Sequence, residues 1–293
     1  MRIDELPQSA RIEDRRGIPG GRGGIGIGTV VVLALIGWAL GIDPRMLIGG
    51  AEMVLGGGEQ QQTSSPSTKP GSASDTTGHF VSAILGSTET VWTDIFAQSG
   101  RSYTAPTLVM FSGATQSGCG AARSAMGPFY CPLDQKVYLD TSFFQDLEGR
   151  LGACQVGSKT CQFSQAYVIA HEVGHHVQNL LGVLPKVQQA QRAMDETESN
   201  SLQVRVELQA DCLAGVWANR GQAKWDFIEP GDVDSALQTA SAIGDDRLQR
   251  RSQGYVVPDA FTHGSSAQRA RWFTTGLNSG TVASCDTFRN EQL

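Results

Sequence analysis

One ten-residue segment of the sequence has the residue types and the spacing of a zinc site. It runs from Val168 to Val177 and contains the pattern His-Glu-x-x-His. On a helix, His171 and His175 project from the same face, so both rings can reach one metal ion. Glu172 is rotated about 100° from His171. Two imidazoles that hold Zn²⁺, with a carboxylate that takes a proton from its bound water, are the parts of a zinc hydrolase.

The residues around this pattern favour a buried helix. Glu172 is the only acidic or basic residue of the segment apart from the histidines, as expected for a helix that protein covers on most of its circumference. Ser164 is a candidate N-cap, and Gly182 is a candidate helix stop. His176 lies about 140° round the helix from His171, and we interpret it as a packing or exposed residue and not as a ligand.

A third ligand is needed, because catalytic zinc usually has three protein ligands and one open position. The best candidate is Glu207, which shares a face of the next long helix with Asp211. Apolar neighbours such as Leu208 indicate that this helix is half buried, and two carboxylates there need a cation or an N–H donor. We therefore expect Glu207 to bind zinc and Asp211 to orient His171 or His175. The alternative is a solvated acidic face.

These motifs resemble those of the gluzincin metallopeptidases. His171-Glu172-x-x-His175 followed by Glu207-x-x-Ala210-Asp211 is similar to the pattern of membrane-associated metalloproteases such as the CAAX-prenyl endopeptidases. Those proteases carry a His-Pro and a following Arg to which transition-state stabilisation is attributed. Here Thr262-His263-Gly264 and Arg269 occupy that place, with Gly instead of Pro. The resemblance implies catalytic roles for His263 and Arg269.

A closer similarity is to the bacterial "putative neutral zinc metallopeptidase" (YpfJ-like) family. Its members show an N-terminal segment like residues 12–17, one membrane span, Gly-Pro-Phe-Tyr-Cys-Pro as at 127–132, Val-Tyr-Leu-Asp as at 137–140, and both metal motifs. The resemblance covers nearly the whole chain except the linker. It implies a zincin-like metalloprotease domain with a zinc cofactor. The family name rests largely on the zinc motif and implies no particular substrate.

The composition is that of a globular protein with appendages. The chain has 293 residues, of which 40% are hydrophobic and 18% charged, and its net charge of −6 argues against nucleic-acid binding. Residues 1–24 hold five Arg and four acidic residues without apolar periodicity, and we expect a disordered cytoplasmic tail. Residues 49–78 are rich in Gly, Ser, Thr, Gln and Pro and predict a flexible linker. The folded domain should therefore span residues 79–293.

Residues 25–48 predict a transmembrane helix. The stretch from Ile25 to Ile42 carries no charge and is at the lower length limit for a bilayer span. A signal peptide normally has a shorter charged leader and a small-residue cleavage site, so we favour a retained anchor over a signal peptide or a core helix. Three Arg lie shortly before the span and one just after it. The positive-inside rule then predicts a cytoplasmic N-terminus and a periplasmic or extracellular catalytic domain.

The periodicities predict an α+β domain that is mainly helical with a small sheet. Helices are expected at 79–98, around the zinc motif, at 185–220 with an interruption near 195–201, at 232–251 and at 265–277. Strands are expected at 107–113, 129–131 and 136–140. One of these strands is our candidate for an edge strand that binds a peptide through main-chain hydrogen bonds. The Gly- and Ser-rich loop at 113–127 could line the cleft.

The six cysteines fit an oxidising compartment. The pairs Cys119–Cys131 and Cys154–Cys161 each close a short loop, and we predict these two disulfides. Cys212 and Cys285 could pair or stay free. A cysteine metal site is not favoured, since no Cys-x-x-Cys spacing occurs.

Together these features predict a membrane-anchored zinc endopeptidase. Zn²⁺ on the two histidines and Glu207 would lower the pKa of its bound water towards about 7, and Glu172 would act as the general base and later protonate the leaving amine. By the resemblance, His263 with Arg269 would stabilise the oxyanion. Two alternatives stay open: a membrane-tethered binding or scaffold protein with a structural or inactive zinc site, and a zinc hydrolase that does not act on peptides. The sequence predicts neither the physiological substrate nor the oligomeric state.

Overall fold

A computed structural model describes residues 1–17, 75–149, 161–289 and 293. One compact unit comprises Met1–Arg16 and Lys69–Leu293, and a second comprises Gly17–Thr68, nearly all of which lies outside the described residues. The first unit is mainly helical with a small sheet, so the predicted α+β class is confirmed.

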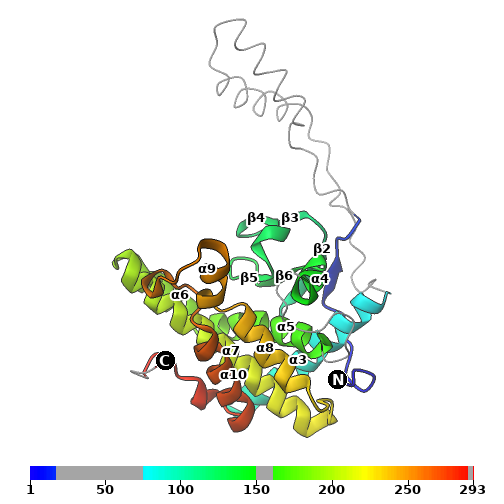
Figure 1. Cartoon of the computed structure of the whole chain (residues 1–293). Coiled ribbons are helices and arrows are strands. Elements are labelled where there is room, and N and C mark those ends of the chain that lie inside the picture. The colour runs from blue at the N-terminus through cyan, green and yellow to red at the C-terminus, as the bar shows by residue number, and fades with distance from the viewer. Residues whose placement is uncertain (18–74, 150–160, 290–292) are drawn as a thin grey trace, which may run out of the picture. The chain divides into compact units, whose positions relative to one another are not determined.

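Helices make up most of the first unit (Figure 1). They are α3 (Thr76–Gln98), α4 (Ser142–Glu148), α5 (Cys161–Leu180), α6 (Val183–Gln191), α7 (Glu196–Trp225), α8 (Asp232–Ala242), α9 (Asp245–Gln253) and α10 (Ser266–Ser279), with 3₁₀ turns η1 (Ser124–Met126), η2 (Pro258–Ala260) and η3 (Val282–Cys285). Helix α5 packs against α3, α7 and α8, and α10 packs against α7 and α8. The helix that carries the His-Glu-x-x-His pattern is therefore surrounded by other helices.

The sheet has the strand order β1-β2-β6-β5. These strands are β1 (Ile12–Asp14), β2 (Thr107–Phe111), β6 (Lys136–Asp140) and β5 (Phe129–Cys131). The first three are parallel, and β5 runs antiparallel to β6 at the edge of the sheet. The segment predicted as a loop at 113–127 contains a hairpin of β3 (Ala114–Ser117) and β4 (Gly120–Arg123).

Local sequence signals set several of the helix ends. Asp195 and Ser265 each cap a helix through a capping box, with Glu198 and Gln268 as the reciprocal partners. Gly182 has a φ of 77°, as expected for a glycine that ends a helix.

Two predicted helix features were wrong. The helix expected at 232–251 is divided into α8 and α9, because the turn at Gly244 brings the chain against the start of α10. A Cβ atom there would lie 2.5 Å from the backbone nitrogen of Ser266. Ser164 does not cap α5, which begins three residues earlier. Its hydroxyl instead lies 2.7 Å from that of Ser235 in α8.

The N-terminal residues are ordered, so the prediction of a disordered tail was wrong for the described residues 1–17. The side chains of Met1, Leu6 and Ile12 are buried in the main core, and β1 pairs with β2. The charges that suggested disorder form ion pairs instead. The Asp14 carboxylate is 2.6 Å from Arg16, and that of Glu13 is 2.5 Å from Lys136. Paired charges and a few well-spaced apolar residues suffice to fix a short segment against an existing sheet edge.

This strand pairing also corrects the predicted membrane topology. Residues 12–14 and 107–111 are neighbours in one sheet, so they lie on the same side of any membrane. A single crossing between them would separate the two strands, and the predicted cytoplasmic N-terminus with an external domain is therefore incompatible with this fold. The predicted span at 25–48 and the linker up to residue 74 lie outside the described residues. Within the described ranges, no helix is both long and apolar enough to cross a bilayer.

Two disulfides join described residues. Cys119–Cys131 is formed as predicted, and Cys212–Cys285 links α7 to η3, which decides a question that the sequence left open. Cys161 is also disulfide-bonded, but its predicted partner Cys154 lies outside the described residues. The Cys212–Cys285 bond ties the C-terminal segment to the helix that carries Glu207.

Replacing Ile12 with Ala tests the integration of the N-terminal strand. The side chain is 2% exposed, so its truncation leaves a cavity and should lower the free energy of unfolding by about 2–5 kcal/mol. Urea denaturation measures the change. Arg11→Ala, on an exposed neighbour, should have little effect. Equal stability of the two variants would mean that residues 1–16 are not part of the folded unit.

Candidate metal centre

The candidate site is built at the crossing of α5 and α7. A Cβ atom on Gly174 would lie 3.0 Å from the carbonyl oxygen of Ala210 and 3.2 Å from its Cα. Glycine and alanine at the contact therefore let the two backbones approach closely. His171 and His175 flank Gly174 on α5, and Glu207 lies one turn before Ala210 on α7. The close crossing brings these three side chains together.

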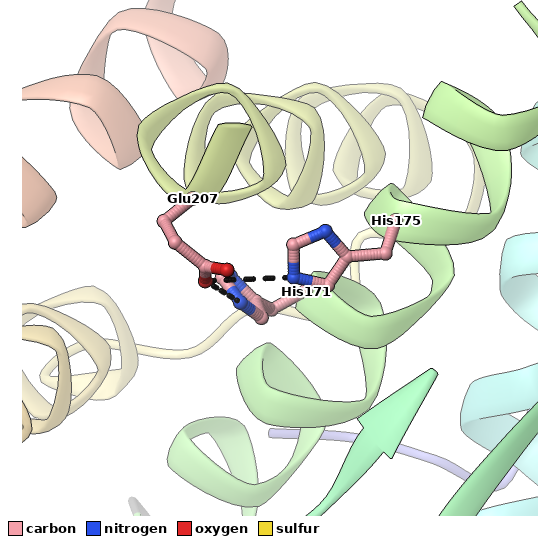
Figure 2. A group of neighbouring side chains, drawn as sticks. All are labelled: His171, His175 and Glu207. Atoms are coloured by element: carbon pink, nitrogen blue, oxygen red, sulfur yellow. Dashed lines mark ion pairs between the residues drawn. The ribbon is translucent and has the colours of Figure 1, made fainter. Parts of the chain in front are cut away.

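The three side chains converge as a metal site requires (Figure 2). The Glu207 Oε2 atom lies 3.2 Å from His171 Nε2 and 3.5 Å from His175 Nε2, and one possible ligand atom from each residue lies within 4.8 Å of the others. Ligand atoms about 2.0–2.1 Å from a tetrahedral zinc ion are separated by roughly 3.3 Å. Two imidazoles and one carboxylate are also common zinc ligands. The residues present therefore fit the zinc ion expected from the sequence.

The charge of the site also favours a cation. Burial opposes protonation of His171, but the adjacent carboxylates of Asp211 and Glu207 together outweigh burial and raise the pKa of His171 to about 10. Burial alone would raise the pKa of Glu207, yet the two histidines hold it well below its usual range. Buried carboxylates beside imidazoles thus attract positive charge, which protons supply in the metal-free protein and a dication would supply in their place.

Asp211 orients His171 and not His175. Its Oδ1 atom accepts a hydrogen bond from His171 Nδ1 at 2.8 Å and another from the Tyr167 hydroxyl at 2.5 Å. The carboxylate is fully buried. This contact leaves Nε2 of His171 free to face the metal, as in other sites where a carboxylate supports a histidine ligand.

Arg269 lies behind this pair. Its Nε atom donates to Asp211 Oδ2 at 2.8 Å and its Nη2 atom donates to Oδ1 at 2.9 Å. The side chain is 3% exposed. These two parallel hydrogen bonds hold the guanidinium against the Asp211 carboxylate. The positive charge of the guanidinium balances the negative charge of the carboxylate. The contacts of Arg269 therefore favour a positioning role through Asp211 and His171 over the direct oxyanion contact that the resemblance implied.

The two other candidate ligands, His175 and Glu207, form hydrogen bonds with uncharged glutamine side chains. His175 Nδ1 lies 2.8 Å from Gln178 Oε1, and Gln203 donates to Glu207 Oε1 at 3.0 Å. The bond from Gln203 leaves Glu207 Oε2 for the metal. Neither glutamine was singled out in the sequence. Their spacing gave a signal, because Gln178 follows His175 by three residues and Gln203 precedes Glu207 by four, which places each pair on one helix face.

The site opens into a cavity of about 490 Å³. Glu172 lines this cavity together with the two histidines and Glu207, as a general base must. The volume of the cavity is typical of ligand sites. Apolar side chains form much of the remaining wall: Phe129, Phe143, Leu184, Val187 and Leu248. Phe129 belongs to β5, so the edge strand of the sheet borders the same cavity.

His263 lines the cavity as well, held by Asp245 at the start of α9. Asp245 Oδ2 accepts hydrogen bonds from the backbone N–H groups of Thr262, His263 and Gly264 at 2.6–3.1 Å, and its Oδ1 atom lies 3.2 Å from His263 Nδ1. Burial would raise the pKa of Asp245, but these hydrogen bonds lower it. Holding the ring through Nδ1 leaves Nε2 as the ring atom for a ligand in the cavity.

Gly264 explains the departure from the His-Pro pattern of the resembling proteases. Its φ of 91° is in a region that proline cannot adopt, and its N–H group donates to Asp245 at 3.1 Å. Proline here would lose both the turn and the hydrogen bond. The glycine is therefore needed for the way in which Asp245 holds this segment and His263.

His176 is a packing residue, as predicted. It is fully buried, its Nε2 atom lies 2.6 Å from the carbonyl oxygen of Thr104, and its Nδ1 atom lies 3.0 Å from the Tyr130 hydroxyl. Because the carbonyl can only accept, Nε2 carries the proton and Nδ1 accepts from Tyr130. His176 thus joins the zinc-motif helix to β5, since Tyr130 is in that strand.

Comparison with known proteins agrees with this geometry. Residues 1–288 match the family described as "putative neutral zinc metallopeptidase". The uncharacterized protein YpfJ of Escherichia coli strain K12 is 45% identical over 301 aligned residues, covering 98% of this chain and 99% of that protein. The uncharacterized protein Rv2575 of Mycobacterium tuberculosis is 44% identical over 222, covering 73% and 71%. No solved structure was found to match. With a family match over nearly its whole length, this chain belongs to the "putative neutral zinc metallopeptidase" family.

Proposed function

We propose that this protein is a zinc-dependent endopeptidase. The observation that carries the proposal is the convergence of His171, His175 and Glu207, within 4.8 Å of one another, beside Glu172 in one cavity. Family membership supports zinc as the metal. Bound zinc would supply a Lewis acid that lowers the pKa of a coordinated water.

Glu172 is the general base of this proposal. It follows His171 directly on α5, so its carboxylate reaches the cavity beside the ligands and not between them. It would take the proton of the attacking water and deliver it to the leaving amine. His263 would donate to the oxyanion through Nε2, while Asp245 holds the ring.

The position of strand β5 favours a peptide as the substrate. It is an edge of the sheet and carries Phe129 and Tyr130, both of which line the cavity. An edge strand has one row of backbone N–H and C=O groups that no neighbouring strand uses, and an extended peptide can pair with them. The apolar wall of the cavity would then accept a hydrophobic side chain of the peptide.

The alternative of a structural zinc site is less well supported. A structural site closes the metal with a fourth protein ligand, whereas the cluster found among the described residues has three. Its donors also face a cavity and not the packed interior.

We further propose that the folded unit acts in an oxidising compartment. Disulfides such as Cys119–Cys131 persist where thiols are not kept reduced, which supports an exported domain. Residues 1–16 belong to this unit and would share its compartment. A single membrane crossing at residues 25–48 would separate residues 1–16 from the rest of this unit, so we do not propose the membrane anchor predicted from the sequence.

Glu172→Gln should abolish peptidase activity without loss of zinc. The substitution removes the base but none of the three ligands. Casein digestion measures activity and atomic absorption measures the bound metal. A chelator should inactivate the wild-type protein, and added zinc should restore it. Undiminished casein cleavage by the variant would refute the assignment of Glu172.

Asp211→Asn should weaken zinc binding by about 10–100-fold, because an amide is a poorer partner for the Nδ1–H group of His171 and leaves the Arg269 charge unbalanced. Competition with a chromophoric chelator measures the affinity. Asp234→Asn, on an exposed residue of α8, is the control. Equal zinc affinity in the two variants would contradict the role given to Asp211.

His263→Ala should lower kcat by about 100-fold with zinc content unchanged, as for other oxyanion donors. Thr262→Val removes a hydroxyl 3.1 Å from His263 Nδ1 but keeps the contacts of Asp245 with the ring and the backbone, so it should leave kcat within a few-fold. Steady-state kinetics with a fluorogenic peptide would separate the two. A His263→Ala variant with wild-type kcat would exclude a catalytic role for this ring.

A further inference from the structure

The partner of His175 belongs to a chain of hydrogen bonds that runs from the candidate metal site to the C-terminal segment. His175 Nδ1 lies 2.8 Å from Gln178 Oε1, and Gln178 Nε2 lies 3.0 Å from Gln209 Oε1. Gln209 Nε2 in turn lies 2.9 Å from the carbonyl oxygen of Cys285. None of these contacts involves Asp211 or Arg269, so they form a second support for the site.

The direction of every bond in this chain follows from its fixed acceptors. Gln178 Nε2 also lies 2.8 Å from the carbonyl oxygen of Val206, which can only accept. The NH₂ group of Gln178 must therefore face α7, and its Oε1 atom must face His175. An oxygen there can only accept, so His175 carries its proton on Nδ1. In the neutral ring, which is the form that binds a metal, Nε2 of His175 then has the lone pair, and this is the atom 3.5 Å from Glu207.

Gln209 is oriented in the same way. Its Nε2 atom faces the Cys285 carbonyl, so its Oε1 atom is the one available to Gln178. Cys285 is held by its disulfide to Cys212, three residues after Gln209 on α7. The amide of Gln178 is thus fixed by α7 and by the segment bound to it. Gln178 itself is fully buried, where an amide with unmet hydrogen bonds would be costly.

We propose that Gln178 is a positioning residue for His175, and that Gln209 holds the Gln178 amide in the orientation that leaves His175 Nε2 for the metal. The inference rests on the proposed zinc site. It assigns the two histidines different supports: the anionic Asp211 behind His171 and a neutral amide pair behind His175. The neutral partner fixes the tautomer of His175 without a further buried negative charge beside Glu207.

The test compares three Gln→Met variants of the full chain, which keep side-chain length and lose the amide. Gln178→Met should weaken zinc binding by about 10–100-fold, the usual effect of losing such a partner. Gln209→Met should weaken it less, because the Val206 carbonyl still orients Gln178. Gln165→Met, on the same helix α5, removes an amide whose Nε2 atom lies 3.4 Å from Glu148 and should have no effect. Chelator competition gives the affinities.

A second measurement separates positioning from packing. In long-range ¹H–¹⁵N spectra recorded at a pH high enough for the ring to be neutral, His175 of the metal-free wild-type protein should carry its proton on Nδ1, and Gln178→Met should lose this single tautomer. Lower stability of metal-free Gln178→Met in urea, with zinc affinity and tautomer unchanged, would overturn the proposal and leave a structural role. If Gln178→Met does not fold, an unchanged zinc affinity of Gln209→Met overturns it, and a weakened affinity supports it. A wild-type protein that binds no zinc would refute the site itself.

Discussion

The close approach of α5 and α7 is the constraint on which the site depends. The two backbones meet where Gly174 faces Ala210, and a side chain larger than these would push the helices apart. Helix α7 is equally confined on its other side. A Cβ atom on Gly276 of α10 would lie 1.9 Å from the carbonyl oxygen of Cys212. Because α7 is held between two close neighbours, Glu207 and Asp211 cannot shift relative to the histidines without disturbing the core.

Charge balance is the second requirement of this arrangement. Burying carboxylates is costly unless they are paired, and the structure pairs those of Asp211 and Glu207. Asp211 is balanced by Arg269, and Glu207 faces two imidazoles that a dication would bridge. Every ligand also has a partner on its far side that leaves one atom for the metal. These partners fix the orientation of the three side chains, which lowers the cost of ordering them around a metal.

The sheet borders the cavity through its edge strand β5. The strand β1 from the N-terminus covers one edge, and the short antiparallel strand β5 forms the other. His176 and Tyr130 connect β5 to α5, so the edge strand and the zinc motif are held in a fixed relation. The N-terminal segment, which the sequence suggested to be a tail, thus completes the side of the sheet that does not face the site.

The sequence by itself determined most of the helices and the candidate ligands His171, His175 and Glu207. The four-residue spacing of His171 and His175, and that of Glu207 and Asp211, fixed which side chains share a helix face, because local periodicity alone decides this. Only the tertiary structure decided which histidine Asp211 supports, that Arg269 binds Asp211, and that Cys212 pairs with Cys285. It also decided that residues 12–14 form a strand and that Asp245 holds His263. These are contacts between segments far apart in the chain, and they depend on how closely helices and strands can pack, which residue types and spacing do not express.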